Sequence, residues 1–280
     1  MRQVPTGPDT VTAALEFLCP ANERPYTYMY PPPDGGPWQN SDYRRENVRV
    51  RDARAVAASL SIDREGFELH HAPSAVRDFM NQDEVLRYHY PEAAQLACAA
   101  TGASRAIVFD HLLRRRQPGP PLAFGRRDGH RPGAAGRVHC DFTLASAQRR
   151  LAIEMGDADA ASKIARYSIV NLWRPIRHPV LDVPLALCDA RTVAPGQLVA
   201  SDIFYPERGG EIYQAVYGAE FAWSYFSALT RDETLIFKQF DSLRTGVARF
   251  TPHAAFEHPA APDDAPPRES IETRCLLIFD

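Results

Sequence analysis

Several features are absent from this chain of 280 residues, and each absence excludes a class of protein. The five cysteines are scattered and form no Cys-x-x-Cys pair, which argues against a disulfide framework or a structural zinc site. No apolar run approaches membrane-spanning length, and the chain does not open with a basic segment followed by an apolar run. A formal net charge of -3 gives no electrostatic reason to bind nucleic acid or an anionic membrane. We therefore expect a soluble, cytoplasmic protein with reduced thiols.

Turn-forming residues are plentiful by contrast, with 24 prolines and 16 glycines between short apolar runs. Frequent turn residues between short apolar runs are typical of a β-rich protein. Strands are predicted early in the chain at Thr10–Leu18, Asn47–Arg51, Phe67–His71 and Arg105–Leu113, and helices at Asp83–Thr101 and Leu144–Met155. Later strands are predicted at Tyr167–Arg174, Leu185–Asp189, Gln197–Ser201, Glu211–Tyr217, Phe221–Leu229, Thr234–Phe240, Val247–Thr251 and Ser270–Phe279. We predict a mainly β fold with flanking helices, an antiparallel double-sheet barrel of the jelly-roll or cupin kind.

The motif of greatest interest is His139-x-Asp141. In an extended segment both side chains point to the same face, while Cys140 points to the other. An imidazole and a carboxylate so placed can occupy two adjacent positions of a metal. Two histidines and one carboxylate on one face of the ion are the ligand set of non-haem Fe(II) oxygenases. A His-x-Asp pair is common by chance, so the interpretation depends on a third ligand elsewhere.

The third ligand should be a histidine in the later, β-rich part of the chain. His253 is the better candidate, because it is expected to terminate a strand beside Pro252, where a side chain can be turned into the barrel mouth. His258 is an alternative in a looser, proline-flanked context. The remaining histidines are expected to be surface or core residues.

A second group, Arg268-x-Ser270, follows at the start of the last predicted strand. Alternation places both side chains on one face, where a guanidinium and a hydroxyl would make a receptor for a carboxylate. Arg274 faces the same way and is the alternative anchor. Taken alone, the pair would more readily be a surface arginine and a turn serine; its position after the histidine favours the carboxylate receptor.

In this order, His139-x-Asp141, His253 and Arg268-x-Ser270 resemble the motifs of the Fe(II)/2-oxoglutarate-dependent oxygenases. More narrowly, the chain is similar to the AsaB-like hydroxylase/desaturase group, which includes a gibberellin desaturase, a fungal meroterpenoid endoperoxidase and a cephamycin 7α-methoxylation component. The similar stretches are residues 166–175, 184–189, 235–242, 252–256 and 267–274. They lie between about residues 138 and 280, and the first hundred residues resemble the group only loosely.

The resemblance implies a double-stranded β-helix with His139, Asp141 and His253 as iron ligands. It implies that 2-oxoglutarate chelates the iron while Arg268 and Ser270 hold its distal carboxylate, and that O2 is consumed with release of succinate and CO2. We expect a single domain, residues 1–280. Residues 1–137 would form an α/β elaboration and residues 138–280 the core that carries the iron site. The loop at residues 117–137 would be either a lid or a solvated loop.

Other pocket residues are less clearly marked in the sequence. Asn171 and Trp173 share a face of a predicted strand and would line the cavity or pack in the core. Lys238 lies in an apolar strand, where a buried ammonium needs a partner. It would contact substrate or cosubstrate, or form a structural ion pair. Arg274 is a further candidate for substrate contact.

We therefore predict an oxygenase that hydroxylates, desaturates or cyclises a small molecule in specialised metabolism. It would act alone, as a homodimer or with a partner biosynthetic enzyme. Three other functions are compatible with the same motifs: an iron oxidase that does not use 2-oxoglutarate, a non-catalytic accessory subunit, and a zinc-dependent hydrolase.

Overall fold

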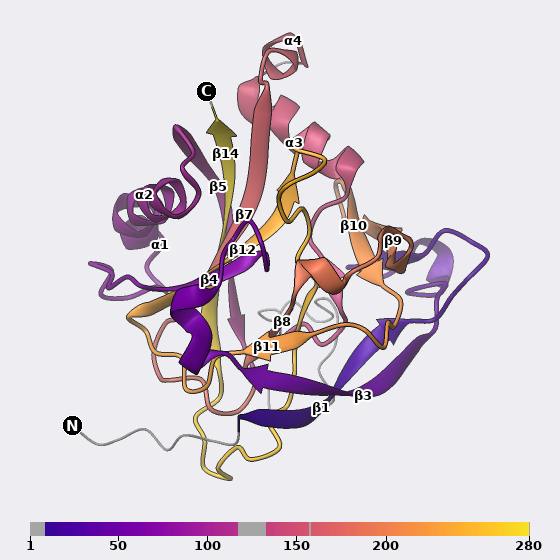
Figure 1. The fold of residues 1–280 in the computed structure, drawn as a ribbon. Helices are drawn as coiled ribbons and strands as arrows, with labels where there is room; N and C mark the ends of the chain where they lie inside the picture. The colour runs from indigo at the N-terminus through magenta and orange to yellow at the C-terminus, as the bar shows by residue number, and fades with distance from the viewer. Residues whose placement is uncertain (1–8, 117–132, 157, 280) are drawn as a thin grey trace.

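Two β-sheets face each other, and a helical segment covers the outer face of the smaller one (Figure 1). The computed structural model describes residues 9–116, 133–156 and 158–279. Among these residues, no helix combines the length and the apolar character needed to cross a membrane. The predicted jelly-roll arrangement is confirmed.

The smaller sheet is entirely antiparallel and has five strands. Their spatial order is β4 (Phe67–His71), β12 (Glu233–Asp241), β7 (Arg166–Pro175), β14 (Glu269–Phe279) and β5 (Arg105–Arg115). All five were anticipated to within a few residues. The three central strands, β7, β12 and β14, are buried on both faces, whereas the edge strands β4 and β5 are mostly half-buried.

The larger sheet has nine strands and curls around the smaller one. Their order is β1 (Thr10–Leu18), β3 (Tyr43–Asp52), β11 (Trp223–Tyr225), β8 (Leu185–Cys188), β13 (His253–Ala255), β6 (His139–Cys140), β10 (Gly209–Ala215), β9 (Leu198–Phe204) and β2 (Tyr26–Tyr28). Only the β11–β3 and β2–β9 pairs of this sheet are parallel among the described residues. The two histidine-bearing strands, β6 and β13, lie side by side in its middle.

Strand alternation divides the apolar residues of the larger sheet between two cores. In β8, Leu185 and Leu187 pack with Trp173 of β7 in the space between the sheets. Ala186 and Cys188 point the other way, into a cluster with residues of β1 and β3. A period-2 strand buried on both faces reads as a continuous apolar run, which is why β8 was recognisable in the sequence.

One helical segment packs on the outer face of the smaller sheet. It consists of α1 (Gln82–Glu84), the π-helical turn η3 (Val85–His89) and α2 (Tyr90–Thr101). The break expected before Pro91 takes the form of this π turn, since proline cannot donate the helical hydrogen bond. The helix ends at Gly102, whose φ of 72° is the left-handed conformation that glycine adopts readily.

A second helix, α3 (Leu144–Met155), begins three residues after Asp141 and coincides with its predicted range. Its N-cap is Thr143, whose hydroxyl accepts a hydrogen bond from Ser146 N at 3.1 Å. A short helix, α4 (Ala158–Ser162), follows. The remaining helical turns are η1 (Pro33–Gly35), η2 (Arg54–Ser59), η4 (Ala190–Thr192) and η5 (Pro195–Gln197).

The prediction of a strand at Val247–Thr251 is wrong. These residues form a loop whose backbone bonds to other segments: Ala248 N donates to Asp63 O at 2.7 Å, and Thr251 N donates to Lys238 O at 3.0 Å. The apolar run looked like a strand, but its hydrogen bonds come from single contacts rather than from a ladder. The strand is β13 instead, so His253 begins a strand where it was expected to end one.

Segments on both sides of residue 137 contribute strands to both sheets. The single domain and its division at this point stay predictions. Most of the expected lid, residues 117–132, lies outside the described residues.

Candidate metal centre

The two histidines of the proposed triad come from neighbouring strands. His139 on β6 and His253 on β13 are a cross-strand pair, and their ring centroids lie 4.4 Å apart. Both side chains are buried, at 4% and 2% exposed. Pairing in this register puts both imidazoles on the face of the larger sheet that looks toward the smaller one.

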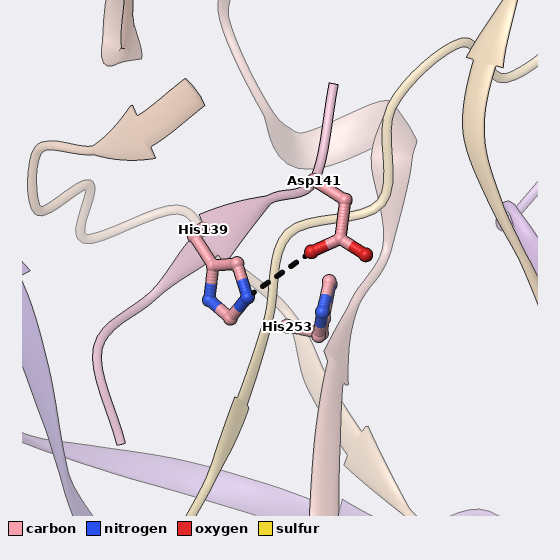
Figure 2. Close-up of side chains that lie close together, drawn as sticks. All are labelled: His139, Asp141 and His253. Carbon is pink, nitrogen blue, oxygen red and sulfur yellow. Dashed lines mark ion pairs between the residues drawn. The ribbon is translucent and has the colours of Figure 1, made fainter. Parts of the chain in front are cut away.

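Asp141 follows β6 by one residue and completes the cluster (Figure 2). Its Oδ1 lies 3.4 Å from Nε2 of His139. The ligand atoms that His139, Asp141 and His253 offer all lie within 4.8 Å of one another. The structure therefore brings together the three residues that the sequence motifs singled out, and they could hold a metal ion.

Each imidazole is held by a backbone carbonyl two residues before it. Nδ1 of His139 lies 2.7 Å from Arg137 O, and Nδ1 of His253 lies 3.2 Å from Thr251 O. A carbonyl oxygen can only accept, so Nδ1 carries the proton and Nε2 keeps its lone pair. Burial lowers the pKa of His253 to about 3. His253 is thus neutral near pH 7, as a metal ligand must be.

The carboxylate of Asp141 is held on its other oxygen. Oδ2 accepts hydrogen bonds from Asn171 Nδ2 at 2.8 Å and from Arg274 Nε at 2.9 Å. The backbone N of Asp141 donates to Gln239 Oε1 at 2.7 Å. Burial alone would raise the pKa of Asp141, but the charge of Arg274 outweighs it and keeps the pKa well below its ordinary value.

The donor set fits a divalent transition metal. Two imidazole nitrogens and one carboxylate oxygen suit Fe(II), and this number of protein ligands leaves positions open for other molecules. Zinc uses the same atom types, so the donors alone do not select the metal.

Arg268 immediately precedes β14 and Ser270 is its second residue, and both are almost fully buried. Arg268 Nη1 donates to Val183 O at 2.9 Å. Among the described residues, Arg268 forms no ion pair, and neither its Nε nor the Ser270 hydroxyl has a hydrogen-bond partner. Burial lowers the pKa of Arg268 to about 10, with a further contribution from the charge of Arg114.

A buried cation without a counter-ion is costly, and so is a buried hydroxyl without a partner. An anion bound here would satisfy both groups at once. Alternation along β14 places Arg268, Ser270 and Arg274 on one face, and Arg274 contacts Asp141. The anion receptor and the metal ligands therefore share one side of the smaller sheet.

Comparison with known proteins agrees with this geometry. A family model described as an oxidoreductase/YMDC permease-like domain matches residues 15–278. The Fe(II)/2-oxoglutarate-dependent dioxygenase nvfI of Aspergillus novofumigatus is 32% identical over 259 residues, which covers 90% of each chain. The chain belongs to the Fe(II)/2-oxoglutarate-dependent dioxygenase superfamily.

A further relative and a solved structure place this dioxygenase within the superfamily. It is 32% identical to the hydroxylase/desaturase efuI of Hormonema carpetanum over 256 residues, 85% of each chain. Its fold superposes on the iron and alpha-ketoglutarate-dependent endoperoxidase NvfI with a TM-score of 0.85. That match is 30% identical and covers 98% of this chain and 99% of the other. The resemblance to the hydroxylase/desaturase group is confirmed.

Other candidate residues of the dioxygenase lie in different settings. Trp173 is buried between the sheets, and the Arg268 guanidinium lies 5.5 Å from its ring centroid. Lys238 is ion-paired with Asp63 and Asp241. His258, the alternative third ligand, lies 3.1 Å from the Tyr225 hydroxyl through its Nε2 and is not part of the metal-binding group.

Three residues of the site were missed in the sequence. Glu272 is buried on β14 and accepts a hydrogen bond from Arg274 Nη2 at 2.9 Å. Strict alternation from Arg268 would have placed it on the site face. Gln239, which holds the backbone of Asp141, and Arg114, which is paired in register with Ser270, carried no comparable signal.

Proposed function

We propose that this chain is a non-haem Fe(II)/2-oxoglutarate-dependent oxygenase that oxidises a small molecule in specialised metabolism. The observation that carries the proposal is the convergence of His139, Asp141 and His253 on the same side of the smaller sheet as Arg268, which is buried and forms no ion pair among the described residues. Neither group alone would distinguish this function. Together they provide a metal site and a carboxylate receptor on one side of a sheet.

Each residue has a separate role in the proposed reaction. His139 Nε2, His253 Nε2 and Asp141 Oδ1 would hold iron, while Arg268 and the Ser270 hydroxyl would hold the distal carboxylate of 2-oxoglutarate. Bound iron and 2-oxoglutarate supply the oxidising chemistry, in which O2 is consumed and 2-oxoglutarate becomes succinate and CO2. The buried surroundings of both histidines and Arg268 keep water away from the reacting groups.

The relatives support a range of outcomes rather than one. Their names include hydroxylase/desaturase, dioxygenase and endoperoxidase. We propose that the small-molecule substrate is hydroxylated, desaturated or cyclised. A cytoplasmic location is supported by five cysteines that form no disulfide. A homodimer or a partner biosynthetic enzyme stays an expectation.

The decisive experiment loads the purified protein with Fe(II) without oxygen and then adds 2-oxoglutarate and O2. Succinate and O2 consumption should appear in a ratio near one, faster when the substrate is present. O2 consumption without succinate would instead indicate an iron oxidase that takes its electrons from the substrate. Tight zinc with no O2 uptake would indicate a hydrolase, and absence of metal binding an accessory subunit.

Substitution of Arg268 tests the cosubstrate receptor separately. Replacing a charged hydrogen-bond partner costs about 3 kcal/mol, so Arg268→Met should lower kcat/KM for 2-oxoglutarate about 100-fold. Arg268→Lys should retain part of the affinity, because it keeps the charge but loses the bidentate fork. Metal affinity should not change in either variant. An unchanged KM for 2-oxoglutarate in Arg268→Met would remove this assignment.

A further inference from the structure

We propose that Asn171 and Arg274 are positioning residues that restrict Asp141 to binding metal through a single oxygen. The inference rests on the metal site of the proposed function but not on its use of 2-oxoglutarate. It concerns how many positions of the ion the protein itself occupies. Asn171 and Arg274 were expected at the sequence level to contact substrate, whereas the structure places both against a metal ligand.

The two carboxylate oxygens of Asp141 have different surroundings. Oδ2 receives two donors, Asn171 Nδ2 at 2.8 Å and Arg274 Nε at 2.9 Å. A carboxylate oxygen offers about two lone pairs, so these donors use the capacity of Oδ2. Oδ1 lies 3.4 Å from His139 Nε2, on the side of the other ligands (Figure 2). Only Oδ1 is left to bind an ion that the histidines also bind.

Neighbouring strands fix the two donors in place. Asn171 on β7 and Arg274 on β14 are directly paired in the antiparallel register, and Asn171 is fully buried. Arg274 is further anchored by Asp110 at 3.2 Å and by Glu272 at 2.9 Å. Its guanidinium thus lies among three carboxylates and has little freedom to move away from Asp141. The smaller sheet therefore orients a ligand that the larger sheet supplies.

Arg274 has a second consequence for the ligand set. Glu272 is a buried carboxylate on the same face of β14, and Arg274 Nη2 binds its Oε1. Without the guanidinium, Asp141 and Glu272 would be two buried carboxylates with no cation between them. Arg274 therefore binds Asp141 and Glu272 at once and offsets the repulsion between these two buried carboxylates.

Monodentate binding by Asp141 leaves three positions of a six-coordinate ion outside the protein. A bidentate aspartate would take a fourth position and leave only two. A chelating keto acid needs two positions and O2 needs one. The orientation of the Asp141 carboxylate thus decides whether the keto acid and O2 can bind the ion at the same time.

The test uses Co(II) as a probe, because its visible spectrum reports coordination number without turnover. The variants are Asn171→Ala and Arg274→Lys. Ser168→Ala is the matched control, because Ser168 is buried on the same strand and bonds to Phe240 O instead of Asp141. Loss of a residue that orients a ligand typically weakens metal binding about 10- to 100-fold. We expect that loss in both variants, with an altered Co(II) spectrum and weaker 2-oxoglutarate binding to the Co(II) protein.

Three results would be informative. Wild-type Co(II) affinity and spectrum in Asn171→Ala and Arg274→Lys would overturn the proposal. An equal loss in Ser168→Ala would also overturn it, since the effect would then be one of general stability. A wild type that binds Co(II) but forms no succinate with Fe(II) would refute the proposed cosubstrate while leaving this inference intact. Arg274→Met is avoided, because it would leave three carboxylates without their cationic partner and is expected to unfold the protein.

Discussion

Lys238 provides the sharpest test of whether a charged residue in the core is structural or functional. Its side chain is 1% exposed, and Nζ lies 2.5 Å from Asp63 and 3.0 Å from Asp241. The Asp241 side chain is fully buried, whereas Asp63 is 44% exposed. The sequence left open whether Lys238 contacts substrate or forms an ion pair. The geometry predicts that Lys238→Met destabilises the fold without affecting substrate binding.

The expected magnitude follows from the partners that remain. Breaking a buried ion pair costs about 3–5 kcal/mol, because one charge is left without compensation. Here Arg166 still lies 3.0 Å from Asp241 and compensates part of that charge. We therefore expect Lys238→Met to lower the free energy of unfolding by about 2–3 kcal/mol. Asp63→Asn should cost less than about 1 kcal/mol, because that carboxylate is largely solvated.

Urea unfolding followed by circular dichroism measures these differences, with metal removed so that its binding does not contribute. The double variant Lys238→Met/Asp241→Asn should recover about 1–2 kcal/mol relative to Lys238→Met, since the uncompensated charge is gone. An unfolding free energy within about 0.5 kcal/mol of wild type in Lys238→Met would contradict the reasoning. A raised KM for substrate at unchanged stability would identify Lys238 as a binding residue.

Three further predictions concern pH, metal and thiols. Burial lowers the pKa of His89 to about 3. As pH falls through about 6.5, His89 therefore becomes protonated in the unfolded chain but stays neutral in the folded chain. The free energy of unfolding should therefore fall as pH drops from 6.5 toward 3, by about 2 kcal/mol at pH 5. In urea unfolding, the free energy of unfolding of His89→Gln should depend less steeply on pH. Mn(II) at 100 times its Kd should raise the free energy of unfolding by about 2.7 kcal/mol, and His253→Ala should abolish this gain in thermal melts. At most Cys19 and Cys98 should react with a thiol reagent in the native state, because the other three cysteines are buried; five fast thiols before unfolding would be inconsistent with the structure.

The elements that were predicted well carry their signals locally. Helix α3 is delimited by Thr143 and Gly156, a capping residue and a left-handed glycine that need no distant partner. Strand β1 alternates buried and less buried residues along nearly its whole length. The three residues that could hold a metal were also picked out in the sequence, two of them because a His-x-Asp pair has a fixed geometry on an extended segment.

The features that were missed depend on distant partners. Arg274 reaches Asp141 across 133 positions of sequence, and Asn171 reaches it across 30. Nothing in the local pattern distinguishes an inward-facing arginine that binds substrate from one that binds a ligand residue. The loop before β13 was predicted as a strand because its backbone hydrogen bonds are made to segments far away in the chain, which the local sequence does not indicate.

The strands that carry the histidines are unusually short, two residues in β6 and three in β13. Few ladder hydrogen bonds therefore determine how these strands align, and a slip by one residue would turn an imidazole to the opposite face. An ion held by both His139 and His253 opposes such a slip directly. Acquisition of the metal and correct alignment of the central strands are thus a single thermodynamic event, and the protein without metal should be least ordered at its own catalytic centre.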